Sequence, residues 1–343
     1  MHHRVVALIA QPRVARSGIS FPALGRRWAL GIGLSVGVCA VVALFPADQM
    51  SRDVGHLVPQ AELISGGLIG VAHNNGDLKP YLMSSTDGAH FHAISGPLTS
   101  GDRDPSLTFW DGKYWMAATQ IGSGDTFDVW SATDPTDADN WAHTVVDVGD
   151  IGTVYYTWAP EWFIDPTHGR GYEQVHIFFA ATTRNDPAGP FRLYEIHPAN
   201  RGMTAWSTPV EVAGTSLPVD QIDPFMVYAP EIGTAGKPYK LWYKENNGAF
   251  IEYMESASLT TGYSVVESGN WAGWKGFRSI EAVCLIRLDD GSWRAYFNEN
   301  AGYTTVGNFY SDSLDDWATW SVRANVDTKS LMSHGTYIRV ASL

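Results

Sequence analysis

The sequence predicts an all-β protein, and three observations support this prediction. The chain is rich in residues that favour strands and tight turns, with 14 Trp, 15 Tyr and 34 Gly among its 343 residues. No helix-period apolar pattern of useful length follows residue 50. Short alternating or apolar runs occur there instead, separated by Gly, Asp, Asn and Pro, which is typical of strands joined by turns.

The N-terminal 50 residues differ from the rest and predict an export signal. They contain five arginines, and Asp48 is their only acid. The uncharged segment WALGIGLSVGVCAVVALF (28–45) follows the pair Arg26 and Arg27. A basic region before an apolar one is typical of a secretory signal, although such a segment is also close to the length of a membrane anchor. We therefore expect the rest of the chain to be extracellular, or held at a membrane if residues 28–45 are not cleaved.

The charge and the cysteines of the remaining chain exclude some classes of protein. Without residues 1–50 the chain has 18 basic and 35 acidic residues, a formal charge of −17. Such an acidic body repels nucleic acid and anionic lipid, so we expect no nucleic-acid partner. The two cysteines are Cys39, in the apolar segment, and Cys284, in a strand-like run. The mature chain therefore has no intramolecular disulfide and no cysteine-based metal site.

A strand pattern recurs with a period near 57 residues and predicts a repeat architecture. The repeats open with RDPSLTFW (103–110), WAPEWFID (158–165), QIDPFMVY (221–228), IEAVCLIR (280–287) and SHGTYIRV (333–340). A second apolar strand follows four of these openings, at 112–119, 173–180, 237–244 and 291–298. Further strands follow, as within 129–146 and 309–322. Units of about four strands and roughly 40–60 residues are typical of propeller blades.

The fifth opening indicates how the ring closes. No strands follow 333–340, but three unassigned strand-like runs lie at 67–73, 79–88 and 91–95. A ring of repeats must close, and a blade built from both ends of the chain closes it. We therefore predict one five-bladed β-propeller domain over residues 60–343, preceded by the segment 1–50. The alternative is a β-sandwich or a two-domain β protein.

Each opening carries a polar residue near its start, and these residues predict a site on the propeller axis. They are Asp104, Glu161, Asp223, Glu281 and His334. The first strand of every blade lies against the axis, so the five side chains are expected to point into one funnel. Clustered carboxyl groups repel one another and lose hydration, which is energetically unfavourable. Such a cluster is therefore expected where the groups bind a cation or where the site needs carboxyls with different pKa values. The alternative is that each acid only caps a turn.

Paired carboxyl groups with aromatic neighbours are suited to glycoside hydrolysis. One carboxyl donates a proton to the leaving oxygen, and the other activates water or attacks carbon. A third acid can raise the pKa of the donor. Sugar rings stack on Trp, and Trp158, Trp271 and Trp274 lie near the openings or just before one, although each can equally be a packing residue. GNWAGWKGFRS (269–279) is the best candidate for a substrate-binding loop.

The motifs together resemble glycoside hydrolase family 43, whose five-bladed propeller enzymes include arabinofuranosidases, arabinanases and β-xylosidases. The resemblance covers about residues 100–340. It implies inverting hydrolysis, with Asp104 as the general base, Asp223 as the acid that tunes the donor, and Glu281 as the general acid. It also implies an oligo- or polysaccharide substrate containing arabinose or xylose.

The resemblance assigns further residues and exposes two departures. Arg103 of the RDP motif and Glu161 are implied to line the sugar pocket, where the family usually has Asp in place of Glu161. His334 matches a histidine near the axis, often beside a bound calcium or water. The resemblance implies no required cofactor. It does imply a structural Ca²⁺ on the axis, with His334 as a candidate ligand. The general acid is commonly followed by Gly-Pro or Ala-Pro, and here Ala282-Val283 follows Glu281.

Other functions remain open on the sequence. A related propeller glycosidase could act on a different sugar, and a propeller could bind carbohydrate without catalysis, although binding alone would not need all three acids. A structural or protein-interaction propeller is a further alternative. Glu245 is a rival general acid, but it ends the second strand of its repeat. The chain has no GxSxG element, no HExxH and no Gly-rich phosphate loop.

Overall fold

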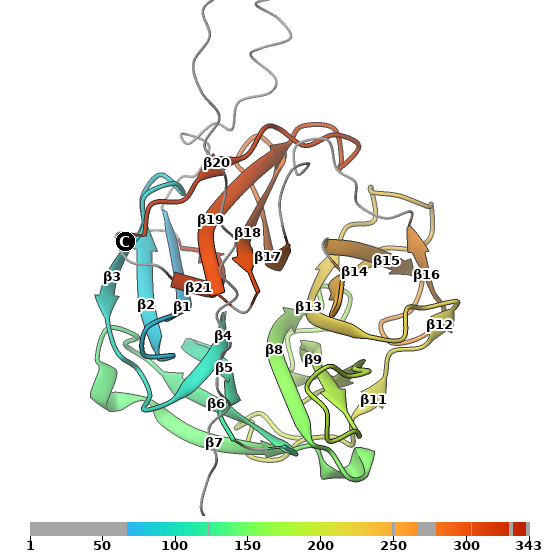
Figure 1. The fold of residues 1–343 in the computed structure, drawn as a ribbon, viewed down its shortest axis with the longest axis horizontal. Helices are drawn as coiled ribbons and strands as arrows, with labels where there is room; N and C mark the ends of the chain where they lie inside the picture. Colours follow the sequence, from blue (N-terminus) through green and yellow to red (C-terminus); the bar gives the residue numbers. More distant parts are fainter. Residues whose placement is uncertain are drawn as a thin grey trace, which may run out of the picture. The chain divides into compact units, whose positions relative to one another are not determined.

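The protein is a five-bladed β-propeller, as the sequence predicts (Figure 1). The computed structural model describes residues 67–122, 124–248, 251–266, 279–302, 304–328 and 332–340. These residues form five small sheets arranged around a central axis. Each sheet is antiparallel, except that one gains a short parallel strand at its outer edge. We number the sheets as blades I to V.

The strands of each blade follow one another in chain order from the axis outward, apart from the outermost strand of blade III and the innermost strand of blade V. Blade I has β4 (Asp102–Trp110), β5 (Lys113–Gln120), β6 (Thr126–Ala132) and β7 (Ala142–Asp147). Blade II has β8 (Tyr156–Ile164), β9 (Val175–Thr182), β10 (Arg192–Ile196) and β11 (Val210–Glu211). Blade III has β13 (Gln221–Tyr228), β14 (Tyr239–Glu245), β15 (Ile251–Ser256), β16 (Tyr263–Val266) and β12 (Gly214–Thr215). Blade IV has β17 (Ile280–Arg287), β18 (Trp293–Ala301), β19 (Thr304–Ser313) and β20 (Ala324–Asn325).

Blade V closes the ring with strands from both ends of the propeller. Its order is β21 (Met332–Arg339), β1 (Leu68–Asn74), β2 (Pro80–Ser85) and β3 (His92–Ser95). The antiparallel register of β1 and β21 places Leu68 opposite Arg339 and His73 opposite Ser333. The predicted closing blade is therefore confirmed, and backbone hydrogen bonds hold the ring shut.

Aromatic side chains pack between neighbouring blades. Trp242 of blade III packs against Trp317 of blade IV with ring centroids 5.0 Å apart. Phe127 of blade I packs against Phe179 of blade II at 5.5 Å. All four are buried, and burying one large apolar side chain contributes about 1.5–3 kcal/mol. This packing holds neighbouring blades together.

Every inner strand is interrupted near its start by a β-bulge. One non-glycine residue in each adopts a positive φ, which is uncommon outside glycine: Asp104 (50°), Ala159 (48°), Asp223 (54°), Ala282 (57°) and His334 (52°). The pairing register with the neighbouring strand shifts at the same place in all five blades. Such strained positions cluster at functional sites. The bulges mark one end of the axis as the candidate site.

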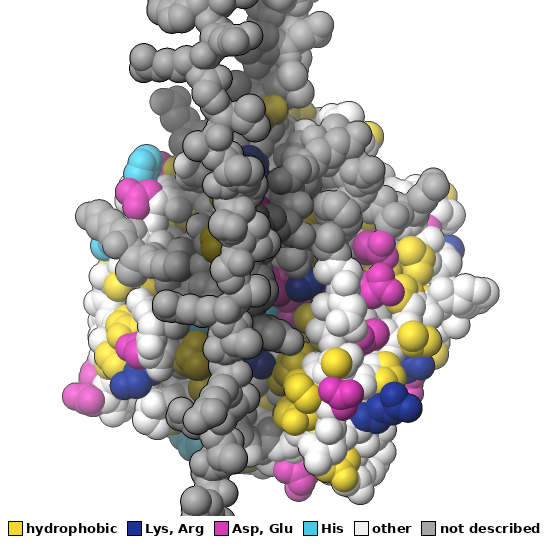
Figure 2. Space-filling model, in the orientation of Figure 1, with side chains coloured by type: hydrophobic (Ala, Val, Ile, Leu, Met, Phe, Trp, Pro, Cys, Tyr) yellow, Lys and Arg dark blue, Asp and Glu magenta, His cyan; other side chains and the backbone are white. Residues whose placement is uncertain are grey.

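Some predictions concern residues outside the described ranges. These are the export signal or anchor at 1–50, the domain start near residue 60, and the substrate-binding tryptophans Trp271 and Trp274. Within the ranges that the structure describes, no helix is long and apolar enough to span a membrane. Where Figure 2 shows coloured side chains, acidic groups lie at several separate places among hydrophobic and basic ones.

Candidate active site

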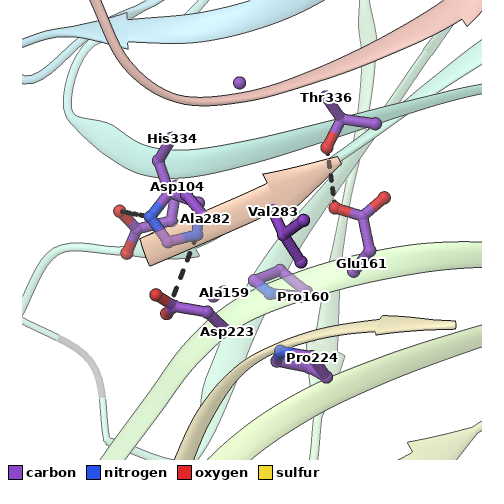
Figure 3. A pocket seen from close by; sticks show the side chains of 11 residues that line it. Asp104, Ala159, Pro160, Glu161, Asp223, Pro224, Ala282, Val283, His334 and Thr336 are labelled. Carbon is purple, nitrogen blue, oxygen red and sulfur yellow. Dashed lines mark hydrogen bonds and ion pairs between the residues drawn. The ribbon is translucent and has the colours of Figure 1, made fainter. Parts of the chain in front are cut away.

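Three bulge residues bring their side chains together on the propeller axis (Figure 3). Nδ1 of His334 lies 3.3 Å from Oδ1 of Asp104, and Nε2 of His334 lies 3.8 Å from Oδ1 of Asp223. The imidazole therefore stands between two carboxyl groups from different blades. The cavity there is lined by Asp104, Ala159, Pro160, Glu161, Asp223, Pro224, Ala282, Val283, His334, Gly335 and Thr336.

Asp104 is buried but is surrounded by groups that favour its ionised form. Burial raises the pKa of this carboxyl, but Coulomb interactions with Arg103, His334 and His73 more than offset it, so the pKa is lowered overall. Nη1 of Arg103 lies 3.2 Å from Oδ2 of Asp104, and the hydroxyl of Thr119 donates to the same oxygen at 3.3 Å. Asp104 is thus an ionised carboxylate at neutral pH.

Asp223 has the opposite electrostatic environment. Burial raises its pKa to about 6, and the negative charge of Glu281 adds to this, while His334 acts against it. Oδ2 of Asp223 is buried and has no hydrogen-bond partner among the described residues. One oxygen of this carboxyl is therefore free for a proton or a ligand hydroxyl.

Glu281 is held beside this group by two polar side chains. Nζ of Lys244 lies 2.9 Å from its Oε2, and Nδ2 of Asn300 donates to its Oε1. The Glu281 side chain is 17% exposed, more than that of Asp104 or Asp223. Its charge and that of Asp104 both raise the pKa of Asp223, so each of these two acids interacts with Asp223.

The prediction that five polar residues occupy equivalent positions is wrong for two of them. Ala159 and Ala282 hold the bulge positions of blades II and IV. Glu281 precedes its bulge residue by one position, and Glu161 follows its own by two. Glu281 is therefore equivalent to Arg103, and Glu161 lies farther along the axis than the acids, as Figure 3 shows.

Glu161 is set apart from the three acids both in position and in charge. Its Oε2 accepts a hydrogen bond of 2.7 Å from the hydroxyl of Thr336. It lines the axial cavity and also a second cavity of about 370 Å³ toward the other end of the inner strands. Burial raises its pKa to about 8, so Glu161 is largely protonated at pH 7.

We expect Glu161→Gln to stabilise the fold at alkaline pH. The native protein keeps the Glu161 proton up to about pH 8, whereas the unfolded chain loses it near 4.5, so stability falls as pH rises between these values. The amide cannot ionise, so the variant lacks this loss. In thermal melts at pH 8 the midpoint of the variant should lie roughly 3–8 °C above that of wild type. At pH 4 the two midpoints should be equal. Equal midpoints at pH 8 would contradict a neutral Glu161.

The second strands supply polar partners that were not predicted. His73 accepts the backbone N–H of Asp104 on Nδ1 at 3.1 Å, and burial lowers its pKa to about 4. The residues paired with the position before each bulge are His73, Thr119, Ala180, Lys244 and Asn298. The side chains of four of these bind inner-strand groups around the funnel. The hairpin register was the signal that could have identified them.

Two predicted substrate-binding residues contact each other, and one of them contacts Asp104. The guanidinium of Arg103 lies over the Trp158 ring, 5.1 Å from its centroid, and Trp158 stacks on Phe191 at 4.3 Å. This places a cation and an aromatic ring beside Asp104. Because two neighbours already contact the Trp158 ring, its role as a sugar platform stays a prediction.

The described side chains do not form a calcium cage around His334. A calcium ion needs six to eight oxygen ligands. Here the two ring nitrogens face different carboxyls, so one ion cannot take His334 together with both acids. The axial calcium therefore stays a prediction.

The arrangement gives two carboxyl groups different pKa values. Asp104 is ionised, whereas the pKa of Asp223 is raised to about 6. Pairs of acids whose environments push their pKa values apart are suited to general acid and base roles. Glu281 does not line the axial cavity, but its charge acts on Asp223. The three acids therefore form one electrostatic site that can take a proton from water and donate one elsewhere.

Comparison with solved structures identifies the fold. An endo-1,4-β-xylanase from Bacteroides thetaiotaomicron superposes with a TM-score of 0.53 at 11% identity, covering 79% of this chain and 98% of that one. The chain shares its fold. An α-L-arabinofuranosidase from Lactobacillus brevis gives 0.48 at 19% identity, covering 64% and 71%. An exo-β-1,3-galactanase from Clostridium thermocellum gives 0.49 at 12% identity, covering 65% and 48%. No protein-family model and no curated protein matches the sequence.

Proposed function

We propose that the protein is a glycoside hydrolase that cleaves a glycan with inversion at the anomeric carbon. The observation that carries the proposal is that ionised Asp104 and Asp223, whose pKa is about 6, face each other across His334 at the propeller axis, with the charge of Glu281 acting on Asp223. Hydrolysis of a glycosidic bond needs both a base and an acid at one site. The shared propeller fold and the resemblance to family 43 support this reading.

In this mechanism each acid has one task. Asp104 takes a proton from the attacking water, because it is the carboxyl held ionised. Glu281 donates a proton to the leaving oxygen, and Asp223 tunes and orients that donor. The water attacks the anomeric carbon as the glycosidic bond breaks. One proton passes from the water to Asp104, and one passes from Glu281 to the leaving oxygen.

We propose pentose-containing glycans outside the cytoplasm as the substrates. The resemblance to arabinofuranosidases and β-xylosidases supports the arabinose or xylose, and the apolar segment at 28–45 supports export. Arg103, Trp158 and Glu161 would contact the sugar. The motifs do not fix the sugar, so the test includes a hexoside.

A panel of three aryl glycosides tests the proposal: an α-L-arabinofuranoside, a β-D-xyloside and a β-D-galactoside. We expect the full-length chain to hydrolyse one pentoside, and proton NMR to show that the first-formed sugar has the opposite anomeric configuration. Retention of configuration would contradict the mechanism. Binding of arabinan or xylan with no hydrolysis of any member would show a carbohydrate-binding propeller instead.

A further inference from the structure

Blade II carries a cluster of histidines and acids at the end remote from the bulges. Strand β8 runs from the bulge at Ala159 to Ile164, so Asp165 and His168 follow its far end. His176 lies near the start of β9, which pairs with that end of β8. Glu195 and His197 lie at the end of β10, which pairs with β9 there. None of the five residues lines the axial cavity.

The donor atoms are close enough together to hold one ion. Asp165, His168 and His176 each offer a ligand atom within 4.8 Å of the other two. His176, Glu195 and His197 form a second such group, which shares His176. Carboxylate oxygen and imidazole nitrogen are ligands of zinc and its neighbours, whereas calcium takes oxygen alone.

His176 shows the strongest sign of a missing partner. The residue is 5% exposed. Its Nδ1 lies 2.7 Å from Oε1 of Glu195, which also lies 3.0 Å from Nδ1 of His197. Its other nitrogen, Nε2, is buried and has no hydrogen-bond partner among the described residues. A buried polar atom without a partner costs about 1–3 kcal/mol, and metal binding would remove that cost.

We propose that Asp165, His168 and His176 bind a Zn²⁺ ion, with water in the fourth position. Glu195 would then accept the Nδ1–H of His176 and orient its Nε2 toward the ion, as carboxylates commonly do behind metal-bound histidines. Asp165 is already fixed by the hydroxyl of Tyr239 at 2.9 Å and by the backbone N–H of Thr167 at 2.8 Å. The ion ties the β8–β9 connection to the blade, independently of hydrolysis.

Solvent can reach the site through one ligand. The His168 side chain is 50% exposed, while Asp165 is fully buried. Nδ1 of His168 lies 3.0 Å from Oδ2 of Asp165. An ion can therefore enter from the His168 side without opening the core. The same exposure makes His168 the safest position for a variant, because its replacement removes little packing.

The chain contains a matched control for His168. Nδ1 of His90 lies 2.7 Å from Oδ2 of Asp87, three residues earlier, as His168 is paired with Asp165. His90 is also exposed, and its pair belongs to no group of three ligands among the described residues. Other histidines that could bind zinc, such as His2 and His3, are present in both variants, so they contribute equally to the zinc content of each.

The experiment compares full-length wild type with His168→Ala and His90→Ala. After equilibrium dialysis against Zn²⁺, we expect wild type and His90→Ala to hold one more zinc per chain than His168→Ala. Zinc should raise the melting midpoint of the first two only, and Ca²⁺ should raise neither. Co²⁺ should give a tetrahedral visible spectrum that His168→Ala lacks. Glu195→Gln should weaken zinc binding roughly 10–100-fold.

Three results would overturn the proposal. The first is equal zinc content in wild type and His168→Ala. The second is a melting shift produced equally by Ca²⁺, which would indicate a site of oxygen ligands. The third is a Co²⁺ spectrum unchanged by His168→Ala, which would place the ion on other groups.

Discussion

We expect Asp104→Asn to lower kcat roughly 10²–10⁴-fold on the glycoside identified by the panel, since a general base contributes about that much. An amide cannot take the proton that the attacking water must lose. Initial rates at saturating substrate measure the effect, and a wild-type kcat would remove Asp104 from the base role.

The substitution is suited to the backbone at this position. Asp104 has a φ of 50°, and Asn tolerates this left-handed region better than most residues. The backbone N–H that His73 accepts is unchanged. Asp102→Asn is the matched control, because Asp102 is also buried in β4 but does not line the axial cavity. The control should keep wild-type kcat, and both variants should fold.

The architecture was predictable because each blade repeats the same physical pattern. An inner strand packed on both sides must be apolar, and the turns between strands need Gly, Asp and Asn, so the period can be read from the residues. Because a ring of blades must close, the strands at 67–95 were then predicted to pair with β21. The positions within the funnel were harder to predict, because a bulge adds one residue and reverses which face a side chain points to.

The bulge residue itself has no common side chain. Asp holds the position in blades I and III, Ala in II and IV, and His in V. Alignment on the polar residues therefore placed Glu161 and Glu281 out of phase. The partners on the second strands, such as Lys244, and the cluster around His176 were missed for a related reason. Hairpin register, which sequence spacing does not fix, brings them to their sites.

We expect Glu281→Gln to remove proton donation while leaving base catalysis intact. On a glycoside with a poor leaving group, kcat should fall roughly 10²–10⁴-fold. On a dinitrophenyl glycoside of the same sugar the loss should be much smaller, because that leaving group departs without a proton. The comparison of the two substrates separates loss of the acid from general damage to the site.

The variant also leaves Lys244 without its partner, so stability needs its own control. The Lys244 side chain is 8% exposed, and removing one member of a buried ion pair destabilises a protein. The double variant Lys244→Met with Glu281→Gln removes the unpaired charge. It should recover the melting midpoint that Glu281→Gln loses, but not the lost turnover. Recovery of both would show that Glu281 acts only through stability.

The same two substrates decide which carboxyl donates the proton. Asp223 is the alternative donor, because its pKa is about 6 and its Oδ2 is free of protein partners among the described residues. If Glu281 donates and Asp223 tunes it, both variants impair proton donation, so the dinitrophenyl substrate should rescue both, and Glu281→Gln should show the larger loss on the poor leaving group. If the dinitrophenyl substrate rescues Asp223→Asn and not Glu281→Gln, the roles of the two acids must be exchanged.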